Sequence, residues 1–125
     1  MRIRALQYLY GICRFGPNDP APSWVTGGEF VSVTRTSEEL SVVCPQRAIP
    51  ESVPSNPDWR VLQVEGPLDF SLVGILAGLS ATLAQANISL FAVSTFDTDY
   101  LLVHEADFKT AVKALRGAGH EVAGD

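Results

Sequence analysis

The sequence predicts an α+β protein made of two βαββαβ modules, the second complete and the first with shortened helices. The second half of the chain has the strand and helix pattern of such a module, and its hairpin recurs in the first half. The 125 residues, 46% hydrophobic and 18% charged, are enough for one compact core or two small ones. We therefore expect residues 1–57 to form a degenerate first module and residues 58–125 a complete second module.

The complete module is predicted to begin with a strand over Trp59–Glu65, which is rich in β-forming residues and stops at a Gly-Pro turn. A helix follows, because apolar residues recur with a 3.6-residue period along one stripe. The residues of this stripe are Leu72, Ile75, Leu76, Leu79 and Leu83. Asp69 or Ser71 is expected to cap the start of the helix.

Gly74 and Gly78 lie inside this predicted helix, where each costs about 1 kcal/mol relative to alanine. Because they are four residues apart, they share one side of the helix. Close packing of the backbone against a neighbouring element is the favoured explanation, and close approach of a ligand is the alternative.

A hairpin and a second helix complete the module. Ser89–Thr95 and Tyr100–His104 are rich in β-formers, and the aspartates between them suit a chain reversal. The second helix is predicted over Ala106–Arg116, with a glycine stop and a short final strand over His120–Ala123. Its inner face consists of Phe108, Val112 and Leu115.

A weak internal repeat relates the two halves. Residues 30–44 align without a gap with residues 90–104, at an offset of 60. Upstream, Arg14–Pro17 aligns with Val64–Pro67 at an offset of 50, so that a strand and its Gly-Pro turn also recur. Chance similarity between two hairpins is the alternative.

The helices of the first module are predicted to be short because prolines interrupt them. Pro20 and Pro22 leave room for only about one turn around Ser23–Val25. Pro45–Pro57, with four prolines, replaces a full second helix and connects the modules.

Composition excludes several classes of partner. With a net charge of −5, the chain lacks the clustered cations of a nucleic-acid-binding protein, so we expect no nucleic acid partner. Lys109, Lys113 and Arg116 are predicted to form a solvated helix face. Phe70–Phe96 carries no charge, but a buried helix followed by a core strand explains it better than a membrane span, so no membrane association is expected.

Two features favour a cytoplasmic location. The N-terminus lacks the long apolar stretch of a secretory signal. Cys13 and Cys44, the only cysteines, lie in apolar runs and are predicted to be buried free thiols of a reducing compartment.

No catalytic or metal-binding constellation is present, and we expect neither enzymatic activity nor a cofactor. His104 and His120 have no cysteine or carboxylate beside them at metal-ligand spacing. The serines lack the G-x-S-x-G setting of a nucleophile, and neither cysteine has a visible activating base.

A ligand site is predicted where the first helix of the complete module begins. Its unpaired backbone N–H groups attract an anion such as an α-carboxylate. Asp97 or Asp99 in the hairpin turn would take an ammonium group, while Thr95 and Thr98 supply neutral hydrogen bonds. The alternative, in which Asp69 only caps the helix and the other two aspartates only build the turn, remains open.

The segments Asp69–Ala77 and Leu83–Val103 resemble small tandem ACT-domain proteins, which are similar to the amino-acid-sensing modules of aspartokinases and to CASTOR-type cytosolic arginine sensors. The resemblance implies two ferredoxin-like modules with antiparallel sheets, no catalytic activity, and ligands at an interface between modules. By position, it implies contact with the ligand backbone from Asp69, Phe70, Ser71, Val73 and Gly74. It likewise implies contact with the ligand amine or side chain from Thr95, Phe96, Thr98 and Asp99.

The leading hypothesis is therefore a non-catalytic module that binds a small molecule, an amino acid, and acts as a homodimer because its sheet edges invite pairing. The first hairpin carries Arg35, Glu38 and Glu39 where the second has threonines and Asp99, so the two modules should not bind equivalently. The alternative is a protein–protein interaction module whose vestigial pocket is filled by its own Phe96.

Overall fold

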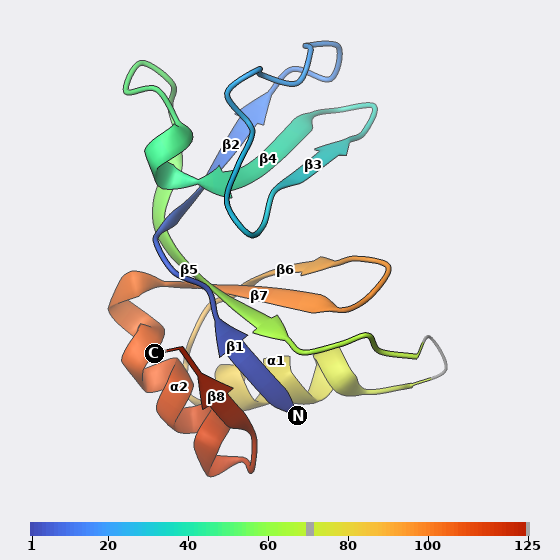
Figure 1. The fold of residues 1–125 in the computed structure, drawn as a ribbon, viewed down its shortest axis with the longest axis vertical. Helices are drawn as coiled ribbons and strands as arrows, with labels where there is room; N and C mark the ends of the chain where they lie inside the picture. Colours follow the sequence, from blue (N-terminus) through green and yellow to red (C-terminus); the bar gives the residue numbers. More distant parts are fainter. Residues whose placement is uncertain (70–71, 125) are drawn as a thin grey trace. The chain divides into compact units, whose positions relative to one another are not determined.

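The computed structural model describes residues 1–69 and 72–124. The chain divides into two compact units (Figure 1). The helical unit consists of Met1–Gln7 and Arg60–Asp125, and the strand unit consists of Tyr8–Trp59. One long strand, β5 (Asn56–Val64), contributes its first residues to the strand unit and its last residues to the helical unit.

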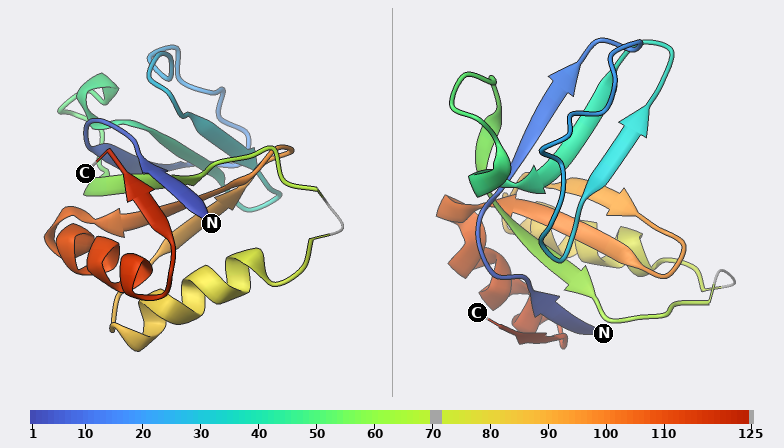
Figure 2. Two further views of the ribbon diagram at one scale, coloured as in Figure 1. Left: turned by 60° about the horizontal axis from the view of Figure 1, so that its bottom comes forward. Right: turned by 45° about the horizontal axis from the view of Figure 1, so that its top comes forward.

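The helical unit contains a mixed sheet with the order β8-β1-β5-β7-β6. Its elements besides β5 are β1 (Arg2–Ala5), α1 (Ile75–Gln85), β6 (Phe91–Ser94), β7 (Asp99–His104), the 3-10 helix η2 (Glu105–Asp107), α2 (Phe108–Gly117) and β8 (Glu121–Ala123). Helices α1 and α2 lie side by side on one face of this sheet (Figures 1 and 2). The predicted hairpin, second helix and final strand are thus present close to their predicted limits.

The N-terminal strand β1 belongs to this unit, which differs from the expected boundary of a first module over residues 1–57. Ile3 pairs with Val64 of β5 in antiparallel register and with Val122 of β8 in parallel register. The expectation of purely antiparallel sheets is therefore wrong for β1 and β8. Strand β1 belongs to this unit because Ile3 and Ala5, which alternate with arginines, are buried in its core.

The core of the helical unit lies between the sheet and the two helices. It is formed by Ile3, Ala5, Leu62, Val64, Leu79, Leu83, Ile88, Leu101, Val103, Phe108, Ala111, Val112, Leu115 and Val122. The predicted inner face of the second helix is confirmed, because Phe108, Val112 and Leu115 are all buried. The amphipathic pattern of α2 therefore predicts correctly which face of the helix is buried.

Helix α1 begins later than predicted. Gly74, with φ 79° in the left-handed region, is its N-cap, rather than Asp69 or Ser71. Leu72 consequently precedes the helix and is 52% exposed, whereas Leu79 and Leu83 are buried as expected. A left-handed residue cannot continue a right-handed helix, so Gly74 fixes where α1 starts.

Close packing does not explain the two glycines. Among residues 1–69 and 72–124, and apart from the adjacent residues and the backbone of the helix itself, no atom lies within 4 Å of a Cβ placed on Gly74 or Gly78. The close-packing interpretation is therefore wrong for both. The backbone conformation explains Gly74, and nothing in the structure explains Gly78.

The strand unit is an antiparallel sheet with the order β3-β4-β2-β5. Its elements are β2 (Tyr10–Phe15), β3 (Ser32–Arg35), β4 (Leu40–Pro45), the 3-10 helix η1 (Gln46–Ala48) and the start of β5. Tyr8–Trp59 is fully described and contains no α-helix. The predicted shortened helices are a turn closed by Val25 N–H donating to the Pro22 carbonyl and the single turn η1.

The hairpins of the two units match at an offset of 59 residues, not 60. Thr36 N–H donates to the Glu39 carbonyl at 2.9 Å, and Thr95 N–H donates to the Thr98 carbonyl at 2.8 Å. The strands share this offset, because Arg35 pairs with Leu40 as Ser94 pairs with Asp99. The ungapped alignment was therefore wrong by one residue, which exchanges the two faces of a strand. The counterpart of Asp99 is the fully buried Leu40 rather than Glu39.

Candidate ligand pocket

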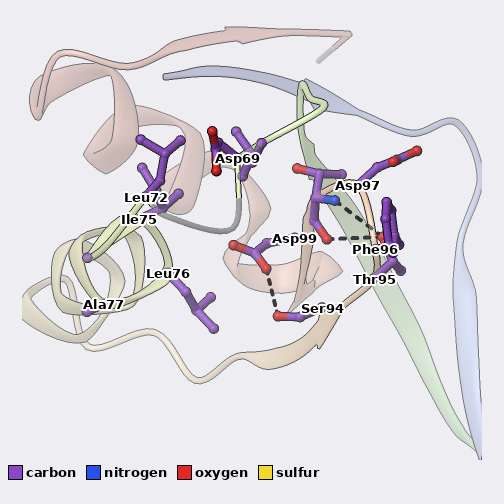
Figure 3. Close-up of a pocket in the computed structure, with 13 residues that line it drawn as sticks. Asp69, Leu72, Ile75, Leu76, Ala77, Ser94, Thr95, Phe96, Asp97 and Asp99 are labelled. Atoms are coloured by element: carbon purple, nitrogen blue, oxygen red, sulfur yellow. Dashed lines mark hydrogen bonds between the residues drawn. The ribbon is translucent and has the colours of Figure 1, made fainter.

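A pocket of about 340 Å³ opens in the helical unit between the start of α1 and the β6–β7 turn (Figure 3). It is lined by Leu68, Asp69, Leu72, Gly74, Ile75, Leu76, Ala77, Ser94, Thr95, Phe96, Asp97, Thr98 and Asp99. Six of the nine residues predicted for the site are thus brought together here. Phe70 and Ser71 lie outside the described residues, and Val73 is 89% exposed and does not line the pocket.

The first turn of α1 supplies hydrogen-bond donors to this pocket. Its first intrahelical hydrogen bond runs from Gly78 N–H to the Gly74 carbonyl at 2.9 Å. The backbone N–H groups of Ile75, Leu76 and Ala77 therefore have no acceptor within the helix, and Gly74 provides no side-chain cap. Together with the helix dipole, these donors attract an anion.

Carboxylates supply the opposite charge. Ser94 Oγ donates to Asp99 Oδ1 at 2.6 Å, which orients the carboxylate and leaves Oδ2 for another partner. In Figure 3 the Asp99 side chain points towards α1, whereas that of Asp97 points away. Asp69 lines the pocket from the segment before α1. Both aspartates considered for the ammonium group line the pocket, but of the two it is Asp99 that directs its side chain towards α1.

The threonine hydroxyls are used within the fold. Thr98 is 5% exposed, and its Oγ1 donates to the Val64 carbonyl at 2.6 Å. Thr95 Oγ1 donates to the Thr98 carbonyl at 3.1 Å, which closes the turn. Both hydroxyls therefore have their donor capacity occupied, and they position the turn that presents Asp99.

The loop between β5 and α1 is tied to the same turn. Leu68 N–H donates to the Asp97 carbonyl at 2.7 Å. A Cβ atom on Gly66 would lie 2.9 Å from that carbonyl oxygen, so only glycine permits this close approach. These contacts hold the two walls of the pocket against each other.

Several lining residues were missed by sequence reasoning. Ile75, Leu76 and Ala77 enter the site because α1 starts after Gly74, and Ser94 enters because it orients Asp99. A Gly-x-x-x-Gly spacing is compatible with either a helix interior or a helix start, so the sequence did not separate the two. The serine opposite Asp99 was visible as a hairpin pair only once the register was known.

Within residues 1–69 and 72–124, no three histidine, cysteine, aspartate or glutamate side chains form a group suited to a metal ion. The same part of the chain has no helix with the length and apolar character needed to span a bilayer.

Comparison with family models decides the family. A model of the ACT domain matches residues 55–117, which is half of the chain. The chain belongs to the ACT-domain family. A second family model, for an N-terminal domain, matches residues 9–52 and covers most of the strand unit of this ACT-domain protein.

Individual relatives agree with this assignment. The cytosolic arginine sensor for mTORC1 subunit 1 from Homo sapiens is 37% identical over 59 residues, 46% of this ACT-domain protein. The matched segment spans only 18% of that sensor. A crystal structure of a protein from Agobacterium tumefaciens is 38% identical, with a TM-score of 0.92, and the match covers 99% of this chain and 92% of that one. An aspartate kinase from Clostridium acetobutylicum shares the fold at 14% identity and a TM-score of 0.67, over 93% of this chain and 34% of the kinase.

Proposed function

We propose that this ACT-domain protein is a non-catalytic regulatory module that binds a free amino acid in the pocket at the start of α1. The observation that carries the proposal is the opposition of two charge types across one pocket. The backbone N–H groups of Ile75, Leu76 and Ala77, which have no acceptor within the helix, suit an α-carboxylate, and the carboxylates of Asp69 and Asp99 suit an ammonium group. A volume of about 340 Å³ suits a small molecule.

The relatives support the class of ligand. The human protein that shares 37% identity over 59 residues is named an arginine sensor, and the shared segment covers less than a fifth of it. Amino-acid sensing is therefore the activity that we carry over, without the identity of the side chain. The location of that relative in the cytosol favours a cytoplasmic role for this protein as well.

We further propose that a second copy of the chain covers the pocket, so that the ligand is bound at an interface in a homodimer. Leu72 and Phe96 line the pocket and are 52% and 81% exposed, and Val73, next to Leu72 in the sequence, is 89% exposed. Large exposed apolar side chains at a pocket are typical of an interaction surface. The edge strands β6 and β8 of the helical unit also offer unpaired backbone groups.

A protein–protein interaction module with a vestigial pocket is the second candidate. In such a module Phe96 is expected to fill the site. Because Phe96 is 81% exposed and the pocket keeps about 340 Å³, ligand binding is favoured over this alternative.

Thermal denaturation of ligand-stripped protein with each of the twenty amino acids tests the proposal. A ligand that binds only the folded state raises the melting temperature, and we expect a selective rise at millimolar concentration. Asp99→Asn keeps the acceptor for Ser94 but removes the charge, so affinity measured by calorimetry should fall about tenfold or more.

Asp97→Asn is the matched comparison, because Asp97 also lines the pocket but its side chain points away from α1. It removes the same charge and should cost clearly less affinity than Asp99→Asn. Equal losses for the two variants, or no response to any amino acid, would rule out the proposed site. Light scattering with and without the ligand tests the homodimer.

A further inference from the structure

A second pocket of about 570 Å³ lies along α2 in the helical unit. It is lined by Arg60, Glu105, Ala106, Phe108, Lys109, Val112, Lys113 and Arg116. It shares no lining residue with the pocket at the start of α1. The two pockets are therefore separate sites.

The charge of this pocket is opposite to that of the whole chain. Four cationic side chains and one carboxylate, Glu105, line it, although the protein carries a net charge of −5. Both lysines of the sequence are among them. The predicted solvated helix face is present, since Lys109, Lys113 and Arg116 are all exposed. Arg60 on β5 joins them in the pocket lining, so that the cations come from two elements.

Arg60 is held in place before any ligand arrives. Its guanidinium carbon lies 3.8 Å from the centroid of the Phe108 ring, and its side chain is only 17% exposed. Nη1 lies 3.6 Å from Glu105 Oε2, and the buried Nε has no hydrogen-bond partner among the described residues. The buried Nε cannot reach a ligand, but the contact with Glu105 is an ion pair longer than a hydrogen bond, so it leaves donor capacity on the Nη groups of this guanidinium.

Arg116 is fixed at the other end of α2. Its Nη2 donates to the Val122 carbonyl at 2.6 Å. Lys109 and Lys113 are exposed and lie on α2 between Phe108, against which Arg60 packs, and Arg116. The pocket thus combines two positioned guanidinium groups with two adaptable ammonium groups, and positioned groups lose less conformational entropy on binding.

We infer that this pocket binds a small molecule that carries a phosphate group. A phosphate monoester brings nearly two negative charges and three acceptor oxygens in one compact group, which matches the excess of positive charge. Guanidinium groups pair with phosphate through two parallel hydrogen bonds. The volume of about 570 Å³ leaves room for the rest of a metabolite against Phe108 and Val112.

Titration of ¹⁵N-labelled protein with inorganic pyrophosphate tests the inference. We expect saturable shifts of backbone amide signals, concentrated on α2 and around Arg60. The variant K109Q/K113Q should bind at least about tenfold more weakly, because it loses two charge-assisted contacts. Both lysines are exposed, so this variant should keep its fold.

The control variant R2Q/R14Q removes two positive charges outside the pocket, from side chains that are 74% and 67% exposed. Its affinity for pyrophosphate should stay within about twofold of the original, since neither arginine lines the pocket and exposed charges are screened by salt. Equal weakening in both variants, or shifts spread over the whole chain, would overturn the inference. Tighter binding of a hexaglutamate peptide than of pyrophosphate would also overturn it and would assign the pocket to an acidic protein segment.

Discussion

Thr98 Oγ1 donates a 2.6 Å hydrogen bond to the Val64 carbonyl, and this contact joins the β6–β7 turn to the end of β5. The threonine is 5% exposed, so the bond lies away from solvent. Two residues further along the chain, the Gly66 backbone approaches the carbonyl of Asp97. Contacts with the end of β5 and the residues after it therefore fix the position of the turn that presents Asp99.

Replacement of Thr98 by valine should destabilise the protein by about 1 to 3 kcal/mol, because it leaves the buried Val64 carbonyl without its donor. Urea denaturation measures the change in the free energy of unfolding. Thr98→Ser keeps the hydroxyl and should lose clearly less. If serine destabilises the protein more than valine does, the packing of the methyl group rather than the hydrogen bond matters.

Gly66→Ala should also destabilise the fold and enlarge or distort the pocket. The added Cβ would lie 2.9 Å from the Asp97 oxygen and 3.1 Å from Thr98 Cβ, so one wall of the pocket must shift. Overpacking of this kind costs about 1 to 3 kcal/mol. Gly117→Ala is the control, since a Cβ there meets no atom within 4 Å, and only the Gly66 variant should weaken ligand binding.

The two glycines near the start of α1 should respond to alanine in opposite directions. Gly78→Ala should stabilise the protein by about 1 kcal/mol, because its Cβ finds open space inside a helix. Gly74→Ala should destabilise it by about 1 to 2 kcal/mol, because φ is 79°. Thermal and urea denaturation of both variants measure these shifts.

Gly74→Asn tests whether the left-handed backbone conformation causes the loss of stability. Asparagine tolerates the left-handed conformation better than alanine, so it should recover part of the loss. A Gly74→Ala variant as stable as the original would mean that α1 can start at another residue.

The sequence predicted elements well where one periodicity covers the whole element. Helix α2 was placed within two residues because Phe108, Val112 and Leu115 form an uninterrupted apolar stripe. Helix α1 was started too early because Leu72 extends the same stripe in sequence, although Gly74 ends it in space. Local backbone conformation, which the stripe does not encode, decided that boundary.

Long-range pairing was the main thing that the sequence did not reveal. Nothing in Arg2–Ala5 indicates that this strand pairs with β5 and β8, far away in the sequence. The sequence reveals the hairpin repeat, but with an offset of 60 residues. The true offset is 59, because Thr36 and Thr95 occupy equivalent positions in the two turns. For the pocket, Asp99 was proposed from residue type, whereas the internal use of Thr98 depends on a tertiary contact with Val64.

Cys44 should make stability depend on alkaline pH. Burial in the strand unit, with a smaller contribution from Cys13, raises the pKa of the Cys44 thiol from an ordinary 9.0 to about 11. The folded state therefore holds this proton more tightly than the unfolded state. The resulting stabilisation is complete below about pH 9 and is lost as the pH rises from 9 towards 11.

Urea denaturation at pH 8 and at pH 10.5 measures this loss, and Cys44→Ala provides the comparison. The variant should be less stable at pH 8, because it leaves space in the core, but its stability should fall less between the two pH values. Apart from Cys13, whose charge acts on Cys44, the groups that titrate in this range are common to both proteins. The difference between the two changes in the free energy of unfolding with pH therefore reports mainly on Cys44. Parallel slopes would show that the thiol ionises equally easily in the folded and unfolded chains. Because the thiolate is the reactive form, the folded protein should also resist alkylation at pH 8 until urea unfolds it.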